Sequence, residues 1–343
     1  MYKIRPVQTS DIDDLYQLAV KMAPGITTFP PDKSVLQCKI EQSIIAFEMA
    51  IEQTVNRQFL LVLEDLSTSK VIGTAGVYNN IGTENPFYSF KIIKQTQINK
   101  DYSLKTCSST LHLTNAFQGG TEVGTLLLDP EYNGMGLGKF LAKSRYLLIA
   151  NFMTLFNEPV FAELRGWSNK TNESPFWEAV GRHFFAGLDF DKADLYSAIS
   201  DNQFIADMMP KYPIYVDLLP KAAQRAIGRA NRKGQAALTM LQQEGFRDEG
   251  YVDIFDAGAT VVANFFDIET IHNSQTYTMH TKTPESLQES DSSLYIATRG
   301  LDDFSVTMHN KYKIVDDELF IDTNEASHLG LINHQTVRAY SLT

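Results

Sequence analysis

One segment gives the clearest indication of the fold, because it predicts a strand, a turn and the start of a helix: Leu126-Leu127-Leu128-Asp129-Pro130-Glu131-Tyr132-Asn133-Gly134-Met135-Gly136-Leu137-Gly138-Lys139. The apolar run stops at Asp-Pro, glycines then alternate through the turn, and apolar residues follow at helical spacing. Glycines let the backbone approach a ligand closely, and free N–H groups at the start of a helix attract anions. The segment therefore predicts a loop that binds an anion such as a diphosphate.

Several kinds of glycine-rich turn could give this pattern. No Gly-Lys-Ser/Thr is present, so the lysine and hydroxyl of a P-loop are missing. The alternating glycines also lack the Gly-x-Gly-x-x-Gly spacing of a Rossmann loop. The order Asn133-x-x-Gly136-x-Gly138 instead resembles the acyl-CoA diphosphate loop of GNAT acyltransferases, usually Gln/Arg-x-x-Gly-x-Gly/Ala. Asn133 departs from that pattern, and a tight turn without any ligand is the remaining alternative.

Length and charge limit the class of protein. The chain has 343 residues, 43% of them hydrophobic, which is enough for a sizeable core in one large or two ordinary domains. Its formal charge is −11 and its pI is near 5.1. Nucleic acid and anionic membrane surfaces are therefore not expected as main partners.

The two cysteines, Cys38 and Cys107, lack the spacing of a disulfide framework or a zinc knuckle, so no metal is expected. No uncharged run reaches the roughly 18 residues that a membrane span needs. These features predict a cytoplasmic protein.

The hydrophobic pattern up to residue 166 predicts an alternation of helices and strands. Strands are expected at 2–7, 59–64, 71–78, 88–93, 110–113, 122–128 and 160–166, and helices at 12–19, 34–51 and 138–153. A strand over 160–166 would place Glu163 and Arg165 on one face. We weigh two interpretations of this pair, a ligand site and a solvated ion pair.

The remainder of the chain carries fewer signals. Residues 170–225 form an insertion rich in aromatic residues and prolines, which favours a packing layer or a dimer surface. A helix that ends at Glu244-Gly245-Phe246 and leads into strands is typical of the last part of a GNAT domain. We therefore predict an α/β fold of the GNAT N-acyltransferase type over 1–260, with a β-rich extension over 261–343.

A narrower resemblance is carried by short motifs in order along the chain. They are Ile4-Arg5-Pro6-Val7, Leu126-x-Leu128-Asp129-Pro130, Ser144-Arg145, Ala162-Glu163-x-Arg165-Gly166, Ser174-Pro175-Phe176-Trp177, Phe204-Ile205-Ala206, Met209-Pro210-Lys211-x-Pro213-Ile214-Tyr215, Glu244-Gly245-Phe246 and Asp253-Ile254-Phe255-Asp256. Together these motifs resemble the arginine N-succinyltransferase family of bacterial arginine catabolism. Several lie in the insertion, which an ordinary GNAT domain lacks, so the resemblance is to this family rather than to the superfamily.

The resemblance implies transfer of succinyl from succinyl-CoA to the α-amine of L-arginine. The family's cofactor leucine falls on Leu126, at the end of the strand that would bind pantetheine. Glu122 is a candidate acceptor for the amine proton, and Glu163 and Arg165 are candidates for binding the guanidinium and the carboxylate of arginine. The expected cofactor-binding residues are Leu126, Leu127, Leu128, Asn133, Gly134, Met135, Gly136, Leu137, Gly138 and Lys139.

One position departs from the family. The proton-donating histidine of the family would fall at Asn231, and asparagine cannot act as a general acid near neutral pH. Asn231 could still donate a hydrogen bond to a thiolate or to the substrate. Two alternatives therefore stay open, a GNAT acyltransferase with another amine acceptor or acyl group, and a CoA-binding relative without turnover. The family resemblance also implies a homo-oligomer.

Overall fold

The computed structural model describes residues 1–22, 29–48, 56–169, 171, 173–190, 192–193, 207–282, 287 and 289–342. The motif Phe204-Ile205-Ala206 and the last residues of the helix predicted at 34–51 lie outside these ranges. The chain divides into two compact units. The first contains Met1–Asn79, Val123–Asn157 and Phe265–Thr343, and the second contains Asn80–Glu122 and Glu158–Asn264. The division of the chain at 260/261 stays a prediction.

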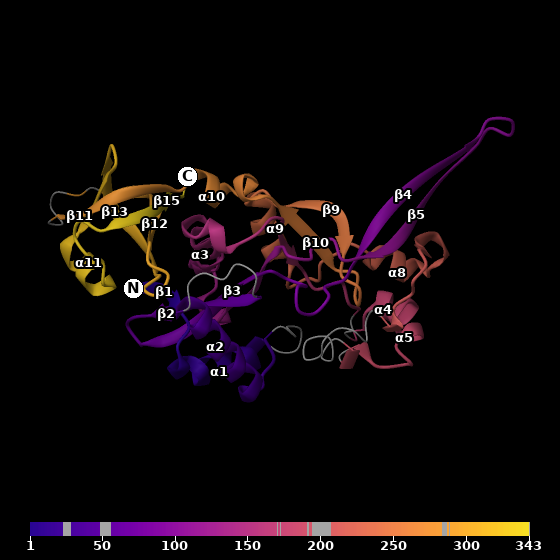
Figure 1. Ribbon diagram of the computed structural model, residues 1–343, viewed down its shortest axis with the longest axis horizontal. Coiled ribbons are helices and arrows are strands. Elements are labelled where there is room, and N and C mark those ends of the chain that lie inside the picture. Colours follow the sequence, from indigo (N-terminus) through magenta and orange to yellow (C-terminus); the bar gives the residue numbers. More distant parts are fainter. Residues whose placement is uncertain are drawn as a thin grey trace. The chain divides into compact units, whose positions relative to one another are not determined.

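The first unit is built on a sheet in the order β1-β2-β3-β6. Helices α1 and α2 cover one face of this sheet, and α3 lies on the other face (Figure 1). The strand β2 is buried along nearly its whole length because both of its faces are covered. The bounds are β1 Tyr2–Pro6, α1 Ile12–Met22, α2 Lys33–Glu48, β2 Arg57–Asp65, β3 Lys70–Asn79, β6 Thr121–Leu128 and α3 Leu137–Asn151.

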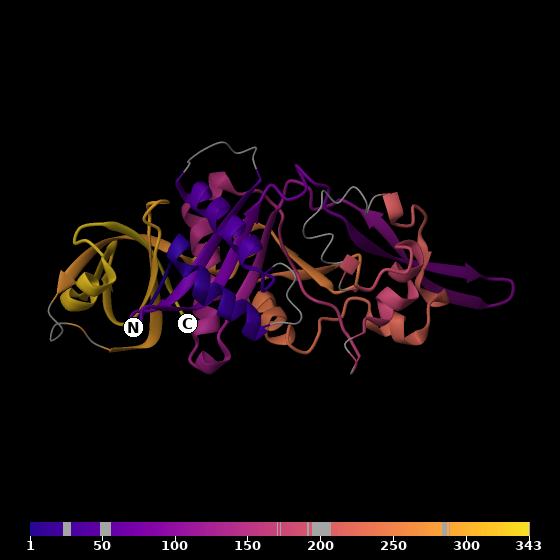
Figure 2. The same cartoon turned by 90° about the horizontal axis from the view of Figure 1, so that it is seen from below.

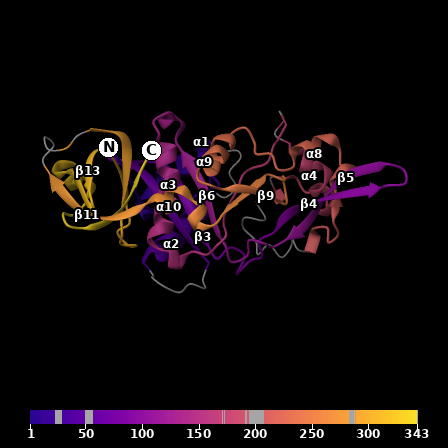
Figure 3. The same ribbon diagram turned by 90° about the horizontal axis from the view of Figure 1, so that it is seen from above.

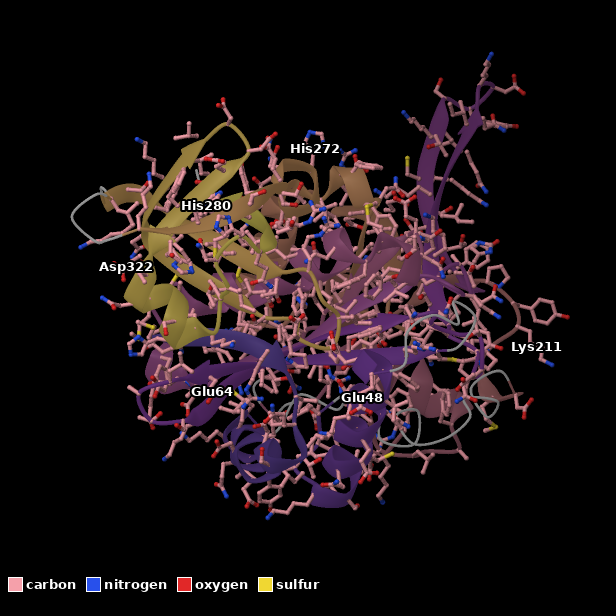
Figure 4. The ribbon with its side chains drawn as sticks, turned by 60° about the vertical axis from the view of Figure 1, so that its left-hand side comes forward. Glu48, Glu64, Lys211, His272, His280 and Asp322 are labelled. Carbon is pink, nitrogen blue, oxygen red and sulfur yellow. The ribbon has the colours of Figure 1, made fainter. Side chains whose placement is uncertain are left out.

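The C-terminal part of the first unit forms a closed ring of five strands. The ring order is β12-β15-β11-β14-β13, and pairing of β13 with β12 closes it. Its core is aliphatic and includes Met279, Ile296 and Val337, while Figure 4 shows His280 and Asp322 on two of its strands. The bounds are α10 Glu269–Asn273, β11 Gln275–Lys282, β12 Glu289–Thr298, β13 Val306–Val315, β14 Glu318–Asp322, α11 Thr323–Leu329 and β15 Thr336–Ser341.

The strands of the second unit follow one another in the order β7-β10-β9-β4-β5-β8, and the first two residues of β6 pair with β7. The aromatic residues of the predicted insertion, including Phe176, Trp177 and Phe185, are buried in the core of this unit. The bounds are β4 Ser89–Asn99, β5 Leu104–Thr114, β7 Val160–Glu163, α4 Pro175–Ala179, α5 Gly181–Phe184, β8 Ile214–Tyr215, α8 Lys221–Ala226, α9 Gln235–Gln243, β9 Arg247–Val252 and β10 Ala259–Ala263.

The strands β4 and β5 form a long hairpin that extends away from the rest of the second unit (Figures 2 and 3). The sequence pattern predicted only the inner half of each strand, because the outer half is polar and lacks apolar alternation.

Two findings concern the described residues as a set. None of the helices they form is long and apolar enough to cross a membrane. Within the same part of the chain, His, Cys, Asp and Glu side chains form no group of three or more that could hold a metal ion.

Candidate active site

The loop after β6 is organised first by Asp129. One carboxylate oxygen of Asp129 accepts a hydrogen bond from the N–H of Glu131 at 3.1 Å, and this bond caps the short turn Pro130–Tyr132. The other oxygen pairs with the Nζ of Lys21 in α1 at 2.5 Å. The charge of Asp129 is therefore balanced by a cation, which reduces its repulsion of an anionic ligand.

The glycines of the loop adopt backbone conformations that other residues rarely take. Gly134 has φ +83° and Gly136 has φ +77°. A Cβ atom built on either residue would meet no other atom within 4 Å. The glycines are therefore required by the backbone rather than by crowding, and the space beside them is open to a ligand.

The helix α3 begins directly after this loop and presents an uncapped N-terminus. Gly136 is its N-cap residue and offers no side chain to the first N–H groups, and its first turn carries no acidic residue. The aligned peptide dipoles of a 15-residue helix favour an anion at this end. The arrangement fits the diphosphate site that the sequence predicted.

A buried polar cluster fixes α3 within the first unit. The Nζ of Lys143 donates to Glu269 and Thr270, each at 2.9 Å, and to the Tyr340 hydroxyl at 3.2 Å. Tyr340 also donates to the carboxylate of Glu269. Because these partners come from α10 and β15, the C-terminal part of the chain holds the helix that begins at the loop.

The predicted cofactor-binding residues are not equally exposed. The side chains of Leu127 and Leu137 are buried in the core, so only their backbone groups could meet a ligand. Leu126 and Leu128 are partly exposed, and Asn133, Met135 and Lys139 are exposed. The loop therefore offers backbone N–H groups together with a few outward side chains.

The strand β6 contains a distortion that sequence reasoning missed. Thr125 has φ +50°, which is strained for a β-branched residue. Its hydroxyl makes a short hydrogen bond with the hydroxyl of Tyr78 in β3. This strained residue immediately precedes Leu126, the predicted cofactor leucine. Only a backbone angle reveals it, because the sequence here is an ordinary strand pattern.

In the second unit, the structure brings Glu122 and Glu163 together. Glu122 lies opposite Phe161 in the parallel pair β6–β7, two residues before Glu163. The Oγ1 of Thr260 in β10 donates to Glu163 at 3.3 Å. Burial raises the pKa of Glu163 well above its usual value, and the charges of Asp253, Glu122 and Asp256 raise it further. Glu163 therefore holds a proton more tightly than an ordinary carboxyl group does.

The prediction that Glu163 and Arg165 share one face of a strand is wrong. The strand β7 ends at Glu163, so Arg165 lies beyond it, and the N–H of Gly166 donates to the carboxylate of Asp256 at 2.8 Å. Arg165 itself pairs with Asp256 at 3.6 Å. Its guanidinium also lies 5.4 Å from the centre of the Phe190 ring. The predicted carboxylate-binding arginine thus already has an acidic neighbour in the protein.

The structure brings Asn231 next to this turn, although the two are far apart in sequence. The N–H of Asn231 donates to the carbonyl of Arg165 at 2.8 Å, and Ala230 pairs with Gly166. The side-chain oxygen of Asn231 accepts a hydrogen bond from the N–H of Gly234 at 2.6 Å. That bond stabilises the turn before α9, so the oxygen of this amide has a structural role.

A strand that ends in a glycine loop at an uncapped helix N-terminus, on a sheet covered by helices, fits the GNAT-type acyltransferase class. Comparison with known proteins identifies the particular family. Residues 2–270 match the family described as arginine N-succinyltransferase beta subunit, and the chain belongs to the arginine N-succinyltransferase family. The fold type and the family predicted from the sequence are both confirmed.

Several relatives match over nearly their full length. The arginine N-succinyltransferase of Yersinia pestis (strain Pestoides F) is 35% identical over 347 residues, covering 100% of this chain and 98% of the relative. The enzyme of the same name from Photorhabdus laumondii is 33% identical over 344 residues, covering 100% and 98%. The solved structure of arginine/ornithine succinyltransferase subunit AI from Pseudomonas aeruginosa has a TM-score of 0.87 and 27% identity, covering 99% of this chain and 98% of that one.

Proposed function

We propose that this chain transfers the succinyl group of succinyl-CoA to the α-amine of L-arginine, giving N-succinylarginine and free CoA. The full-length match to relatives named for this reaction carries the proposal. We further propose that the protein works in the cytoplasm and as a homo-oligomer.

The reaction makes three chemical demands. In the reaction an N–C bond forms as the C–S bond of the thioester breaks. The ammonium group of arginine must first lose a proton, and the departing thiolate must gain one. The acyl oxygen, which becomes negative in the transition state, also needs hydrogen-bond donors.

The residues of the chain supply candidates for these demands. The N–H groups at the loop and at the start of α3 would bind the diphosphate, with Gly134 and Gly136 giving the backbone its shape. The backbone at Leu126 would contact the acyl end. Glu122, on the strand that leads to Leu126, would take up the proton of the amine, directly or through water.

The amino-acid substrate would be held by charge. In this proposal Glu163 or its acidic neighbours attract the guanidinium, while Arg165 attracts the carboxylate. The Arg165 guanidinium lies 3.6 Å from Asp256, so a substrate carboxylate would have to compete with that contact. Asn231 can donate a hydrogen bond through its side-chain nitrogen, whereas its oxygen is bonded to Gly234.

The test is release of free thiol from succinyl-CoA, followed with a disulfide dye, with and without L-arginine. Arginine-dependent release by the natural chain is expected, at a lower rate than in the variant Asn231→His. General acids typically contribute about 10²–10⁴-fold to a rate. If neither the natural chain nor Asn231→His releases thiol, the arginine assignment is contradicted.

A second acceptor is favoured by one observation. The Pseudomonas aeruginosa relative is titled an arginine/ornithine succinyltransferase, so ornithine belongs in the same assay. Release with ornithine but not arginine would favour the alternative of a different amine acceptor. Binding of CoA without release from any acyl donor would favour a non-catalytic CoA-binding protein.

A further inference from the structure

The outer part of the β4–β5 hairpin, residues 92–109, has few partners within its own unit, and we name it the arm. The strands β4 and β5 pair with each other from Ser89↔Thr114 to Asn99↔Leu104. However, β9 pairs with β4 only at Phe90 and Lys91, and β8 pairs with β5 only at Thr110 and Leu111. In the described part of the chain, no third strand extends this ribbon along the arm.

The arm also exposes apolar side chains on a structure that is weak by itself. Ile98, Tyr102 and Leu104 are 65%, 76% and 64% exposed. A two-stranded ribbon is marginally stable in water unless a further strand or another surface covers it. Open strand edges are in addition ready templates for pairing. Figure 4 shows the side chains of this hairpin projecting from both of its faces. These features are those of an interaction surface.

Charge indicates the partner. The arm contains Lys94, Lys100 and Lys105 but only one acidic residue, Asp101, so its net charge is +2. The whole chain has a net charge of −11, so the remainder of the chain carries −13. A basic arm on an acidic protein is complementary to the body of another copy of the same protein.

We propose that the arm binds the acidic body of a second copy of this chain. A two-fold axis makes such a contact reciprocal, so each copy contributes one arm and the assembly closes as a dimer. The apolar side chains at the tip become covered, and the lysines lie among carboxylates. This proposal rests on the homo-oligomer proposed above and names the surface that forms it.

The first test is the oligomeric state of the purified full chain, measured by sedimentation velocity over a wide range of concentrations. The natural chain is expected to be a dimer whose dissociation constant rises with salt, because the contact is partly electrostatic. The variant Lys94→Glu/Lys100→Glu/Lys105→Glu should weaken the dimer at least about tenfold. The control Lys70→Glu/Lys192→Glu/Lys313→Glu makes the same change in net charge at exposed lysines elsewhere and should leave the dimer intact.

A second set of variants tests the apolar contribution. Ile98→Ser/Tyr102→Ser/Leu104→Ser should also favour the monomer, while Phe266→Ser/Ile332→Ser, at exposed positions in the first unit, should not. Circular dichroism checks that each variant is folded. Arginine-dependent thiol release measured on the same samples distinguishes a failed interface from a failed activity, because the arm contains none of the proposed site residues.

Two results would overturn the proposal. The natural chain could be monomeric at all concentrations, or the arm variants could remain as dimeric as the controls. If a monomeric natural chain bound anionic vesicles or RNA through the arm, the lysines would serve a different kind of partner.

Discussion

Two regions of the molecule are built on opposite principles. One is the glycine loop at 133–138, and the other is the carboxylate cluster formed by Glu122, Glu163, Asp253 and Asp256. The loop belongs to the first unit and uses backbone conformation, since its key residues have no side chain. The cluster belongs to the second unit and uses charged side chains from β6, from β7 and from the turn between β9 and β10. A backbone site is carried by consecutive residues, whereas a side-chain site depends on long-range pairing. The following four substitutions test this contrast, beginning with the largest expected effect.

Asp256→Ala should cause the greatest loss of stability. The Asp256 carboxylate accepts hydrogen bonds from the N–H groups of Gly166 and Gly258, each at 2.8 Å, and pairs with Arg165. Each buried donor left without a partner costs about 1–3 kcal/mol, so the free energy of unfolding should fall by roughly 3 kcal/mol or more. Urea unfolding measures the change. Asp256→Asn keeps one of the two acceptor oxygens and should lose less. A loss below about 1 kcal/mol for the alanine variant would show that the cluster is not held by this carboxylate.

Gly136→Val should act on ligand binding more than on folding. The left-handed backbone at φ +77° costs an L-residue about 1–2 kcal/mol, and the new side chain would occupy the open space beside the loop. We expect the KM for the acyl-CoA to rise about tenfold or more.

The matched control for this substitution is Gly119→Val. Gly119 has φ +83° and also has no atom within 4 Å of a built Cβ, but it lies in the second unit. The KM of Gly119→Val for the acyl-CoA should stay unchanged, although this variant should lose about as much stability as Gly136→Val. An equal effect of both variants on KM would argue against a ligand at 133–138.

Tyr78→Phe tests the distortion in β6. The substitution removes the hydroxyl that hydrogen-bonds to Thr125, so Thr125 would lose one support for its left-handed conformation. We expect a loss of about 1 kcal/mol in unfolding free energy together with a higher KM for the acyl-CoA. Tyr277→Phe, which removes a bond to the exposed Gln275, is a suitable control. Unchanged kinetics in Tyr78→Phe would leave Thr125 with a purely structural role.

Glu163→Gln should give the smallest change, and one that depends on pH. The folded pKa of Glu163 is raised above its ordinary value of 4.5, so the folded protein binds the proton more tightly than the unfolded chain does. Stability is therefore lost as the pH rises from that ordinary value through the folded pKa.

Glutamine cannot ionise and still accepts the hydrogen bond from Thr260. The variant should match the natural chain near pH 4 and have a higher Tm near pH 8, by about 2–4 °C for each kcal/mol of relieved cost. Thermal unfolding at both pH values measures this. A lower Tm for the variant near pH 8 would contradict the raised pKa.

Much of the fold near the loop was predictable. The strand before it, the glycine turn and α3 follow from local apolar spacing and from glycine chemistry, so their bounds were correct to within about two residues. The predicted strand at 160–166 was too long. Its apolar pattern continues past Glu163, but a carboxylate about 90 residues later, Asp256, takes the N–H of Gly166. Local patterns cannot show such a competitor.

The candidate site was predicted unevenly for the same reason. The loop residues could be proposed from the sequence because their spacing is itself the signal. The strain at Thr125 and the contact of Arg165 with Asp256 were missed, since each depends on a partner that is distant in sequence. Asn231 was found only through the family resemblance, and its place beside Arg165 required the tertiary structure.

The amino-acid sequence alone was enough to indicate the acyltransferase class and the family, and to propose the anion-binding loop, because these depend on neighbouring residues and on motifs in order. The tertiary structure decided which side chains meet. It closed the strands β11 to β15 into a ring, anchored α3 through Lys143, and gathered three carboxyl groups around Glu163. The physical reason is that burial and electrostatic interactions act across space, so the pKa and the partners of a residue are set by segments that the local sequence does not contain.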